Sequence, residues 1–250
     1  MSKLALGIDV GGTKVAAGLV NNAGKITRFS LEPTSQQNLL GQLVRIAKTY
    51  RGYSSIGLGM PGQVLAAGKV VRLPNVKRFH NVDLKKIFER KFRKLTTVNN
   101  DADCFALAES LLGWGRNNRC VVGVILGTGT GVGVVINKKI FQGKDGLVGE
   151  FDHLLMPNGE LLRFYVKKAR PFKNAAQAKS YLKILLNHIV ISYNPDIIVL
   201  AGGWSNLSGM QRLAQSLTKN TGNYKTITPV KISKITYPGL VGAGLAALKR

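Results

Sequence analysis

The chain opens with apolar residues at every second position, which is the period of a β-strand with one buried face. Leu4, Leu6, Ile8 and Val10 form this row, and a Gly-Gly-Thr turn separates it from a second apolar stretch at residues 14–20. This arrangement predicts a β-hairpin. A similar stretch, "VGVILGTGTGVGVVIN", begins at residue 122 and predicts a second hairpin around "GTGTG".

After each hairpin, strands and helices follow in a similar order. The first half predicts strands at residues 25–31, 55–59 and 95–99, a ribbon near 69–73, and helices at about 35–50, at 82–92 and from 101 to a terminal glycine. The second half predicts a strand near 139–142, a helix at about 175–193, a buried strand in "DIIVLAGG", and then a helix, a strand and a helix up to Arg250. Such a repeat predicts a duplicated α/β fold with a cleft between two lobes. We place these lobes at residues 1–110 and 111–250, with a boundary inside a helix, and expect the last helix to pack back on the first lobe.

The composition is that of a folded globule in a reducing compartment. Of 250 residues, 45% are hydrophobic, and no apolar run approaches the roughly 20 residues of a membrane span or the core of a signal peptide. Cys104 and Cys120 form no C-x-x-C pair, which argues against a disulfide framework and a cysteine-rich zinc site. We therefore expect a cytoplasmic protein with no membrane partner.

The charge is unbalanced, with 36 Lys and Arg against 12 Asp and Glu and a net charge of +24. One explanation is a polyanionic partner such as nucleic acid, an anionic membrane or a phosphate-rich substrate; the other is a solvated basic surface with no specific partner. Because carboxylates are scarce, we examine each one for a structural or functional role. Six of them fall in three short motifs, which contain Asp9, then Asp101, Asp103 and Glu109, and then Glu150 and Asp152.

Both glycine turns are suited to binding phosphate. A tight turn of Gly and Thr presents several backbone N–H groups to one point, and the missing Cβ lets phosphate oxygens come close. One turn on each lobe would hold a polyphosphate from two sides; the plain alternative is that the glycines only shape the hairpins. Asp9 favours the phosphate interpretation, because a carboxylate at the end of an apolar strand needs a cation or hydrogen-bond donors. A Mg²⁺ ion carried by the phosphates would supply that cation.

Two familiar nucleotide-binding motifs do not fit the sequence. "GIDVGGTK" lacks the Lys-Ser/Thr order of a Walker A loop and precedes a strand. "GLGMPG", at residues 57–62, is followed by no helix that would receive a pyrophosphate.

Asp101 is the candidate catalytic group. Asn100 and Asp101 follow a strand and open a helix, where either residue is often a simple N-cap. At the mouth of the cleft, Asp101 would instead accept a proton from an attacking hydroxyl, and phosphoryl transfer requires little beyond alignment and charge neutralisation. Glu150 and His153 in "GLVGEFDH" form a third polar cluster, which suits sugar hydroxyls. Asp152 and His153 alone are too few for a zinc site.

Five motifs in order, "GIDVGGTKVAAGLV", "VNNDADCFALAE", "ILGTGTGVGVVI", "GLVGEFDH" and "NPDIIVLAGG", resemble the ROK family of sugar kinases, which share the fold of actin and hexokinase. The resemblance covers essentially the whole chain. It implies transfer of a phosphoryl group from ATP or polyphosphate to the 6-hydroxyl of a hexose, with glucose favoured, with Mg²⁺ held by Asp9 through water, and with a homodimeric assembly. It also implies a general base at Asp101, a sugar site at Gly62, Asn75, Asn100, Asp101, Glu150 and His153, and a donor site at Asp9, Gly11, Gly12, Thr13, Lys14, Gly127, Thr128, Gly129, Thr130, Gly202 and Gly203.

The chain also departs from that family. It lacks the zinc-binding cysteine cluster and the sugar-binding glutamate that usually follow the Gly-His pair, Arg163 or Glu160 falls near that glutamate, and "NDAD" replaces the commoner "NDAN". We therefore expect no structural zinc and a closer likeness to the short glucokinase branch that uses polyphosphate. For such a donor the sequence offers basic residues near the cleft at Arg116, Arg119, Lys138, Lys139, Lys144, Arg163, Lys167, Lys168, Arg170 and Lys173. An N-acetylhexosamine or N-acetylmannosamine kinase and a catalytically silent sugar sensor or nucleic-acid-binding relative remain the alternatives.

Overall fold

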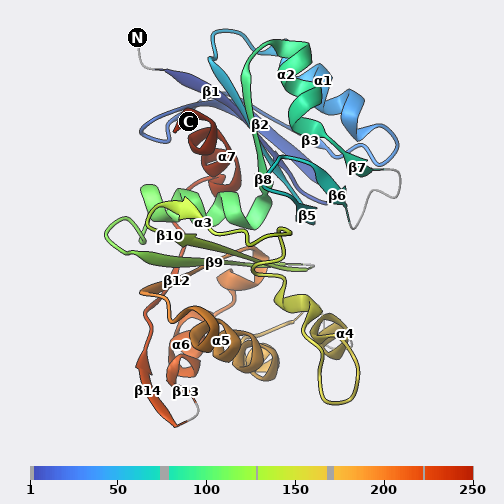
Figure 1. The fold of residues 1–250 in the computed structure, drawn as a ribbon. Coiled ribbons are helices and arrows are strands. Elements are labelled where there is room, and N and C mark those ends of the chain that lie inside the picture. Colours follow the sequence, from blue (N-terminus) through green and yellow to red (C-terminus); the bar gives the residue numbers. More distant parts are fainter. Residues whose placement is uncertain (1–2, 74–78, 128, 168–171, 222, 250) are drawn as a thin grey trace.

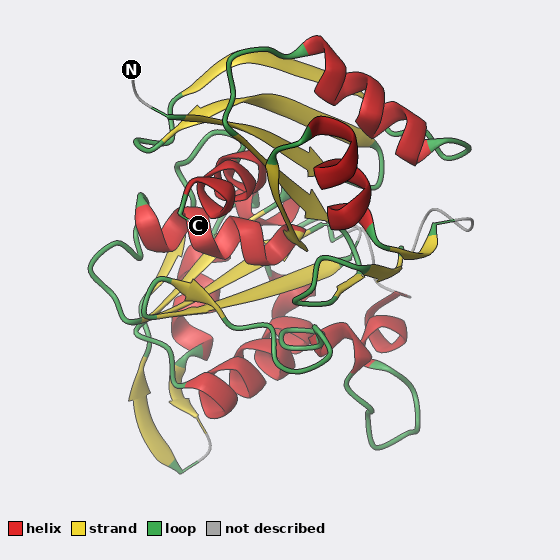
Figure 2. Cartoon of the chain, turned by 45° about the horizontal axis from the view of Figure 1, so that its top comes forward, coloured by secondary structure: helices red, strands yellow, loops and turns green. Residues whose placement is uncertain are grey.

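The computed structural model places two five-stranded sheets one above the other, with two helices packed between them (Figure 1). It describes residues 3–73, 79–127, 129–167, 172–221 and 223–249, and only the backbone of residues 165–167. The two central helices are α3 (Asp101–Leu111) and α7 (Pro238–Leu248). Figure 2 shows these layers from a second direction, with further helices on the outer faces of the sheets.

The first sheet has the strand order β3-β2-β1-β4-β8, in which β2 is antiparallel to β1 and β4 is parallel to it. Its strands are β1 (Leu4–Val10), β2 (Lys14–Asn21), β3 (Ile26–Pro33), β4 (Ser55–Met60) and β8 (Leu95–Asn100). Leu6 and Ile8 are fully buried beneath α1 (Leu39–Thr49) and α2 (Leu84–Phe92) on the outer face. The hairpin predicted from the alternating residues is confirmed.

The second sheet repeats the plan of the first. Its order is β11-β10-β9-β12-β15, again with an antiparallel hairpin and a parallel strand on the other side of β9. Its strands are β9 (Cys120–Leu126), β10 (Thr130–Ile136), β11 (Lys139–Ile140), β12 (Ile197–Ala201) and β15 (Val230–Ile232). Helices α5 (Lys179–Tyr193) and α6 (Met210–Leu217) cover its outer face and share its buried cluster. The halves are therefore duplicated units.

Several predicted boundaries need correction. α1 begins at Leu39 and not near residue 35, because Asn38 caps it by accepting a hydrogen bond from the Gly41 N–H at 2.9 Å. The helix predicted from residue 175 is divided into a short 3₁₀ turn and α5, and the strand predicted to reach residue 142 ends at Ile140. The remaining elements are β5 (Gln63–Val64), β6 (Val70–Arg72) and β7 (His80–Val82) in a small sheet, η1 (Phe151–His153), α4 (Leu162–Lys167), η2 (Ala176–Ala178), η3 (Gly203–Asn206), and the hairpin β13 (Lys219–Thr221) with β14 (Tyr224–Ile227).

Glycines allow the central helices to approach the sheets closely. A Cβ placed on Gly57 of β4 would lie 1.8 Å from the Ala243 carbonyl oxygen of α7, and one on Gly242 of α7 would lie 1.7 Å from the Cys104 carbonyl oxygen of α3. Backbone therefore packs on backbone at these contacts, and any side chain would push the layers apart. This packing holds α7 against the first sheet. The division of the chain at residue 110 stays a prediction, and α3 runs across it.

The Lys138 side chain closes the far end of α3. Its ammonium group lies 2.7–3.1 Å from four carbonyl oxygens, which belong to Ser110, Gly115, Arg116 and Asn118. Burial and the nearby Lys249 lower the pKa of Lys138. The prediction that Lys138 belongs to the basic residues near the cleft is wrong, because its ammonium group binds carbonyl oxygens at the end of α3 farther from Asp101.

We expect Lys138→Met to lower the free energy of unfolding by about 2–3 kcal/mol, because the variant keeps the apolar stem and removes hydrogen bonds from a charged donor. This corresponds to a decrease of roughly 4–12 °C in Tm. Thermal and urea unfolding of Lys138→Met and of Lys139→Met, whose side chain is exposed, would test this expectation. Equal stability of the two variants would contradict the capping role.

Candidate functional site

Asp9 lies at the carboxyl end of β1, next to the first turn of α7. A Cβ on Gly59 would lie 3.1 Å from its Oδ1 atom, and one on Gly239 would lie 2.4 Å from its Oδ2 atom. Any side chain at Gly239 would displace the carboxylate, and one at Gly59 would crowd it. The carboxylate lies where the dipole of α7 favours negative charge. Burial, and then the charge of Asp101, raise the pKa of Asp9 to about 7. The pattern of the sequence gave no signal for Gly239.

Asn100 and Asp101 begin α3 at the end of the parallel strand β8. The Asn100 Oδ1 atom accepts hydrogen bonds from the N–H groups of Ala102 and Asp103 at 2.8 and 3.3 Å, so Asn100 is the N-cap. Its Nδ2 atom donates to the carbonyl oxygen of Gly62 at 3.0 Å, which ties α3 to the turn that precedes β5. The Asp101 Oδ1 atom accepts from the Ala102 N–H at 2.9 Å.

The pKa of the Asp101 carboxyl group lies near neutral pH. Burial raises its pKa to about 7; the Ala102 N–H opposes this shift, and the charge of Glu150 adds to it. Within the described ranges, no ion pair involves Asp9 or Asp101. A chain with a net charge of +24 thus keeps two neighbouring carboxylates without a cationic side chain. Such a donor set fits a hard cation that arrives with phosphates.

A loop from the second half brings Glu150 to this region. The Gln63 Nε2 atom of β5 donates to the Asp145 carbonyl oxygen at 2.8 Å, and a Cβ on Gly146 would lie 2.1 Å from the Val64 carbonyl oxygen. Glu150 and His153 form a pair with 3.2 Å between Oε2 and Nδ1. The predicted sugar-site residues Asp101, Glu150, Asn100 and Gly62 are therefore linked to one another through contacts and charge, whereas Asn75 lies outside the described residues.

The first glycine turn connects β1 and β2. The Gly11 N–H donates to the Lys14 carbonyl oxygen at 2.9 Å and closes the turn. Gly12 and Thr13 lie at its exposed tip. Within the part of the chain that the structure describes, their N–H groups have no hydrogen-bond acceptor. The turn therefore offers backbone donors to a ligand.

The second glycine turn connects β9 and β10 and is fixed by a buried carboxylate. The Asp152 Oδ2 atom accepts from the Thr130 N–H at 3.2 Å, and its Oδ1 atom accepts from the Tyr181 hydroxyl at 3.0 Å. The Tyr181 and Thr130 hydroxyl groups are also hydrogen-bonded to each other. Asp152 thus supports the turn. Tyr181 lies inside the helix predicted at about residues 175–193, and nothing in that pattern indicates its contact with Asp152.

The loop after β12 lies beside this second turn. Gly202 has a φ of 88°, and a Cβ there would lie 2.3 Å from the Leu126 carbonyl oxygen at the end of β9. Gly203 begins η3, and the Gly127 N–H donates to the Gly129 carbonyl oxygen at 3.0 Å. Gly127, Gly129, Gly202 and Gly203 are therefore neighbours, and Thr130 follows at the start of β10. Thr128, the sixth predicted donor-site residue of the second half, lies outside the described residues.

The other singled-out residues have structural or surface positions. Glu109 is fully buried and accepts from the Ser233 hydroxyl at 2.5 Å and the Trp114 N–H at 3.1 Å. Glu160 is exposed and accepts from the Asn158 side chain at 3.2 Å. Of the basic residues predicted to lie near the cleft, Arg116, Arg119, Lys139, Lys144 and Lys173 are exposed and Arg163 is half-buried. Arg116, Arg119 and Lys139 lie at the end of β9 and β10 opposite to the second glycine turn, so the prediction that they lie near the cleft is wrong. The side chain of Lys167, and residues 168 and 170, lie outside the described part.

Neither a metal cluster nor a membrane-spanning helix is present among the described residues. They contain no group of three or more His, Cys, Asp and Glu that would hold a metal ion by itself. No helix among them has the length and apolar character needed to cross a bilayer.

Curated relatives match a large part of the chain. A glucokinase of Thermotoga maritima is 36% identical over 171 residues, which are 64% of this chain and 54% of the relative. An N-acetyl-D-glucosamine kinase of Vibrio atlanticus is 36% identical over 160 residues, which are 60% of this chain and 52% of the relative. The chain therefore spans about half the length of these relatives.

Solved structures match over nearly the whole chain. A ROK hexokinase from Thermus thermophilus has a TM-score of 0.80 at 24% identity over 98% of both chains. A ROK family glucokinase from Streptomyces griseus in complex with glucose and AMPPNP has a TM-score of 0.79 at 22% identity, over 99% of this chain and 100% of that one. An inorganic polyphosphate/ATP-glucomannokinase from Arthrobacter sp. strain KM has a TM-score of 0.71 at 23% identity over 96% of both chains.

These likenesses confirm the predicted fold, a duplicated α/β arrangement of the actin/hexokinase type. Residues 5–171 match the model of the ROK family, a range that runs from β1 past both glycine turns and both carboxylate positions. This match shows that the chain belongs to the ROK family.

Proposed function

We propose that the chain is a sugar kinase that transfers a phosphoryl group from ATP to the 6-hydroxyl of glucose. The observation that carries this proposal is the Asp101 carboxyl group, which has a pKa of about 7 and no cationic partner in the described chain. A general base works best when its pKa lies near the operating pH. The names of the glucokinase relative and of the glucose-bound neighbour support the choice of sugar and donor.

In this proposal each part of the site has one task. Asp101 takes the proton from the sugar hydroxyl, while Asn100, Glu150, His153 and the turn at Gly62 bind the other hydroxyls. The two glycine turns hold the donor phosphates from opposite sides, and residues 202 and 203 lie near the nucleoside. Alignment of the two substrates in a closed, water-poor cleft supplies most of the rate enhancement.

A magnesium ion fits the carboxylates of the site. Asp9 would hold it through water, since Mg²⁺ keeps part of its hydration shell and binds through one or two carboxylates and the phosphates. When bound, the ion would neutralise charge on the donor phosphates.

An N-acetylhexosamine kinase is the second candidate, and the name of the Vibrio atlanticus relative supports it. Both candidates require the same base and the same donor turns, so they differ only in the pocket around the second carbon of the sugar. A silent sugar-sensing protein is less well supported, because such a protein has no use for an unpaired carboxyl group at residue 101. Homodimer formation and a cytoplasmic location stay predictions.

A matrix of donors and sugars tests the proposal. Purified protein would be incubated with Mg²⁺, with ATP or long-chain polyphosphate, and with glucose, mannose, N-acetylglucosamine or N-acetylmannosamine. We expect ATP with glucose to yield glucose 6-phosphate at the highest rate, and chelation of Mg²⁺ to stop the reaction. No sugar phosphate from any combination would contradict the kinase proposal.

Polyphosphate is the second donor that we expect, and its use should depend strongly on salt. A long polyphosphate chain leaves the cleft and meets exposed basic residues such as Lys144 and Lys173, whose weak attractions add along a polyanion but are screened within about 8 Å at physiological salt. The short triphosphate of ATP gains little from them. The apparent affinity for polyphosphate should therefore weaken steeply with rising salt while that for ATP changes far less. Absence of polyphosphate-dependent glucose 6-phosphate at low salt would rule this donor out.

A further inference from the structure

A short segment after β3 holds the back of the first glycine turn. The Thr34 hydroxyl donates to the Gly11 carbonyl oxygen at 2.8 Å, and the Thr34 N–H donates to the Thr13 carbonyl oxygen at 2.9 Å. The Gln36 Nε2 atom donates to the Gly12 carbonyl oxygen at 3.1 Å. Three successive carbonyl groups of the turn are thus bound by residues 34–36.

These contacts determine where the N–H groups of the turn point. In a planar trans peptide the C=O and N–H bonds point in opposite directions. The Gly11 and Gly12 carbonyl groups face residues 34–36, so the N–H groups of Gly12 and Thr13 face the opposite way. Neither of these two N–H groups has a hydrogen-bond acceptor within the described residues. Residues 34–36 therefore orient the two N–H donors away from themselves.

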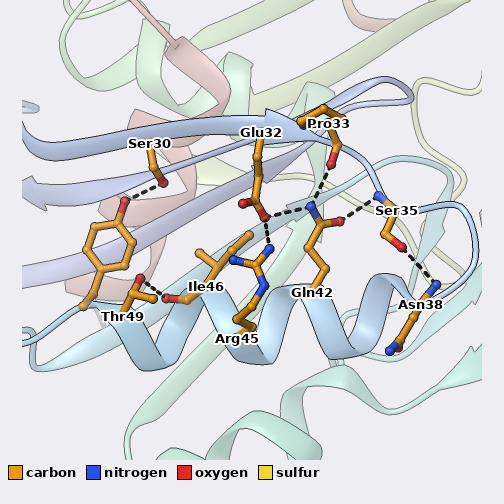
Figure 3. A network of polar contacts seen from close by, with 10 residues as sticks. Ser30, Glu32, Pro33, Ser35, Asn38, Gln42, Arg45, Ile46 and Thr49 are labelled. Carbon is orange, nitrogen blue, oxygen red and sulfur yellow. Dashed lines mark hydrogen bonds and ion pairs between the residues drawn. The ribbon is translucent and has the colours of Figure 1, made fainter.

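The Gln42 side chain of α1 is hydrogen-bonded to the backbone on both sides of Thr34. The Gln42 Nε2 atom donates to the Pro33 carbonyl oxygen at 2.7 Å, and its Oε1 atom accepts from the Ser35 N–H at 2.8 Å (Figure 3). Nε2 also donates to Glu32 at 2.8 Å, and Arg45 pairs with the same oxygen at 2.7 Å. Thr34 and Gln42 are both buried, at 9% and 8% exposure. The support for the turn is therefore anchored in the body of the first lobe.

We propose that Thr34 and Gln36, anchored by Gln42, are positioning residues that aim the backbone N–H groups of Gly12 and Thr13 at phosphate groups of the donor. This inference rests on the proposed function and names the residues through which the first turn acts. In this proposal the two side chains act on the donor only through the carbonyl groups of the turn that they bind. A turn that is held in its binding geometry loses less conformational entropy when phosphate binds, so its loosening weakens the affinity for the donor and leaves the sugar site unchanged.

Thr34→Val is the main test, because it preserves size and removes only the hydroxyl. Thr49→Val is the matched control: the Thr49 hydroxyl also donates to a carbonyl oxygen, that of Ile46 at 2.8 Å, but at the far end of α1 (Figure 3). We expect Thr34→Val to raise the Kd for ATP and the KM for ATP about fivefold, the effect of one lost hydrogen bond. The KM for glucose should stay within twofold, and Thr34→Ser should restore the affinity for ATP. Thr49→Val should leave both constants unchanged.

Gln36→Met provides a second test. Because Gln36 is exposed, this substitution should not lower the stability of the fold. Its control is Gln37→Met, an exposed neighbour whose side chain makes no hydrogen bond within the described residues. Gln36→Met should weaken ATP binding about threefold and Gln37→Met should not.

The outcomes separate this inference from the proposed function. An unchanged Kd for ATP in Thr34→Val, or an equal loss of ATP and glucose affinity, would overturn the positioning role. Calorimetry measures ATP binding without turnover. If the wild-type protein binds ATP but phosphorylates no sugar, the kinase proposal is wrong, and the comparison of Thr34→Val with wild type still tests the positioning role. Wild-type protein that binds no ATP would overturn both.

Discussion

Asp101→Asn is expected to lower the turnover number by a factor of about 10² to 10⁴ while the sugar still binds. Asparagine keeps the size of the side chain and still accepts the hydrogen bond from the Ala102 N–H, which is 2.9 Å long in the native chain. It cannot take up a proton at neutral pH. The loss should therefore appear in kcat, and the Kd for glucose from calorimetry should stay within a few-fold.

The pH dependence gives this prediction a second readout. Because the pKa of Asp101 is raised to about 7, the base is protonated below that pH, and kcat/KM should rise as pH increases through about 7. The residual activity of Asp101→Asn should lack this rise. Asp145→Asn, an exposed carboxylate on the neighbouring loop, is the control for a change of charge alone. Turnover of Asp101→Asn within threefold of wild type would falsify the assignment of the base.

Asp9→Asn should inactivate the protein and at the same time stabilise it at alkaline pH. The folded chain holds the pKa of Asp9 at about 7 against the ordinary value of 3.8. Between these values the folded state binds more protons than the unfolded state, so stability falls as pH rises from about 4 to 7 and the full cost persists above 7. Removing this cost should raise the free energy of unfolding by about 1–3 kcal/mol and Tm by roughly 2–12 °C.

The activity of Asp9→Asn should fall about 100-fold or more, because the carboxylate proposed to hold Mg²⁺ is lost. Thermal unfolding at pH 4.5 and at pH 8.5, without ligands, tests the stability effect. The two proteins should have similar Tm values at the lower pH and should diverge at the higher pH. A variant that is less stable than wild type at pH 8.5 would show that the carboxylate is satisfied within the fold, contrary to the raised pKa.

Local signals in the sequence were enough to predict the two hairpins and the two carboxylates. Each of these signals is local in the sequence. Leu6 and Ile8 show the period of two just before the first glycine turn, and Asp9 and Asp101 each lie at the end of a predicted strand. A β-strand pattern needs only its own neighbours to be read. For that reason the placement of Asp9 and Asp101 at strand ends could be foreseen from the residues alone.

The supports of both turns could not be foreseen in this way. Thr34 reaches back 23 residues to Gly11, and Tyr181 reaches back 29 residues to Asp152. Their polar atoms face inward from positions that the hydrophobic pattern marks only as part of a loop or a helix. The hairpin β13–β14 could not be predicted for another reason. Its segment, "KNTGNYKTI", has few apolar residues, so the sequence shows no alternation of apolar and polar positions there.

The glycine contacts of α7 bear on how the chain acquires its fold during synthesis. The inner face of the first sheet includes Gly7, which lies against the Leu240 carbonyl oxygen, and Gly57, which lies against that of Ala243. A ribosome makes residues 4–60 long before it makes residues 238–248, so the nascent first sheet waits with one face uncovered. Such a sheet is prone to wrong pairing or to capture by chaperones until the last helix emerges. Truncating the chain before Pro238 should therefore trap the nascent protein in this exposed state, even though both glycine turns and Asp101 would already have been made.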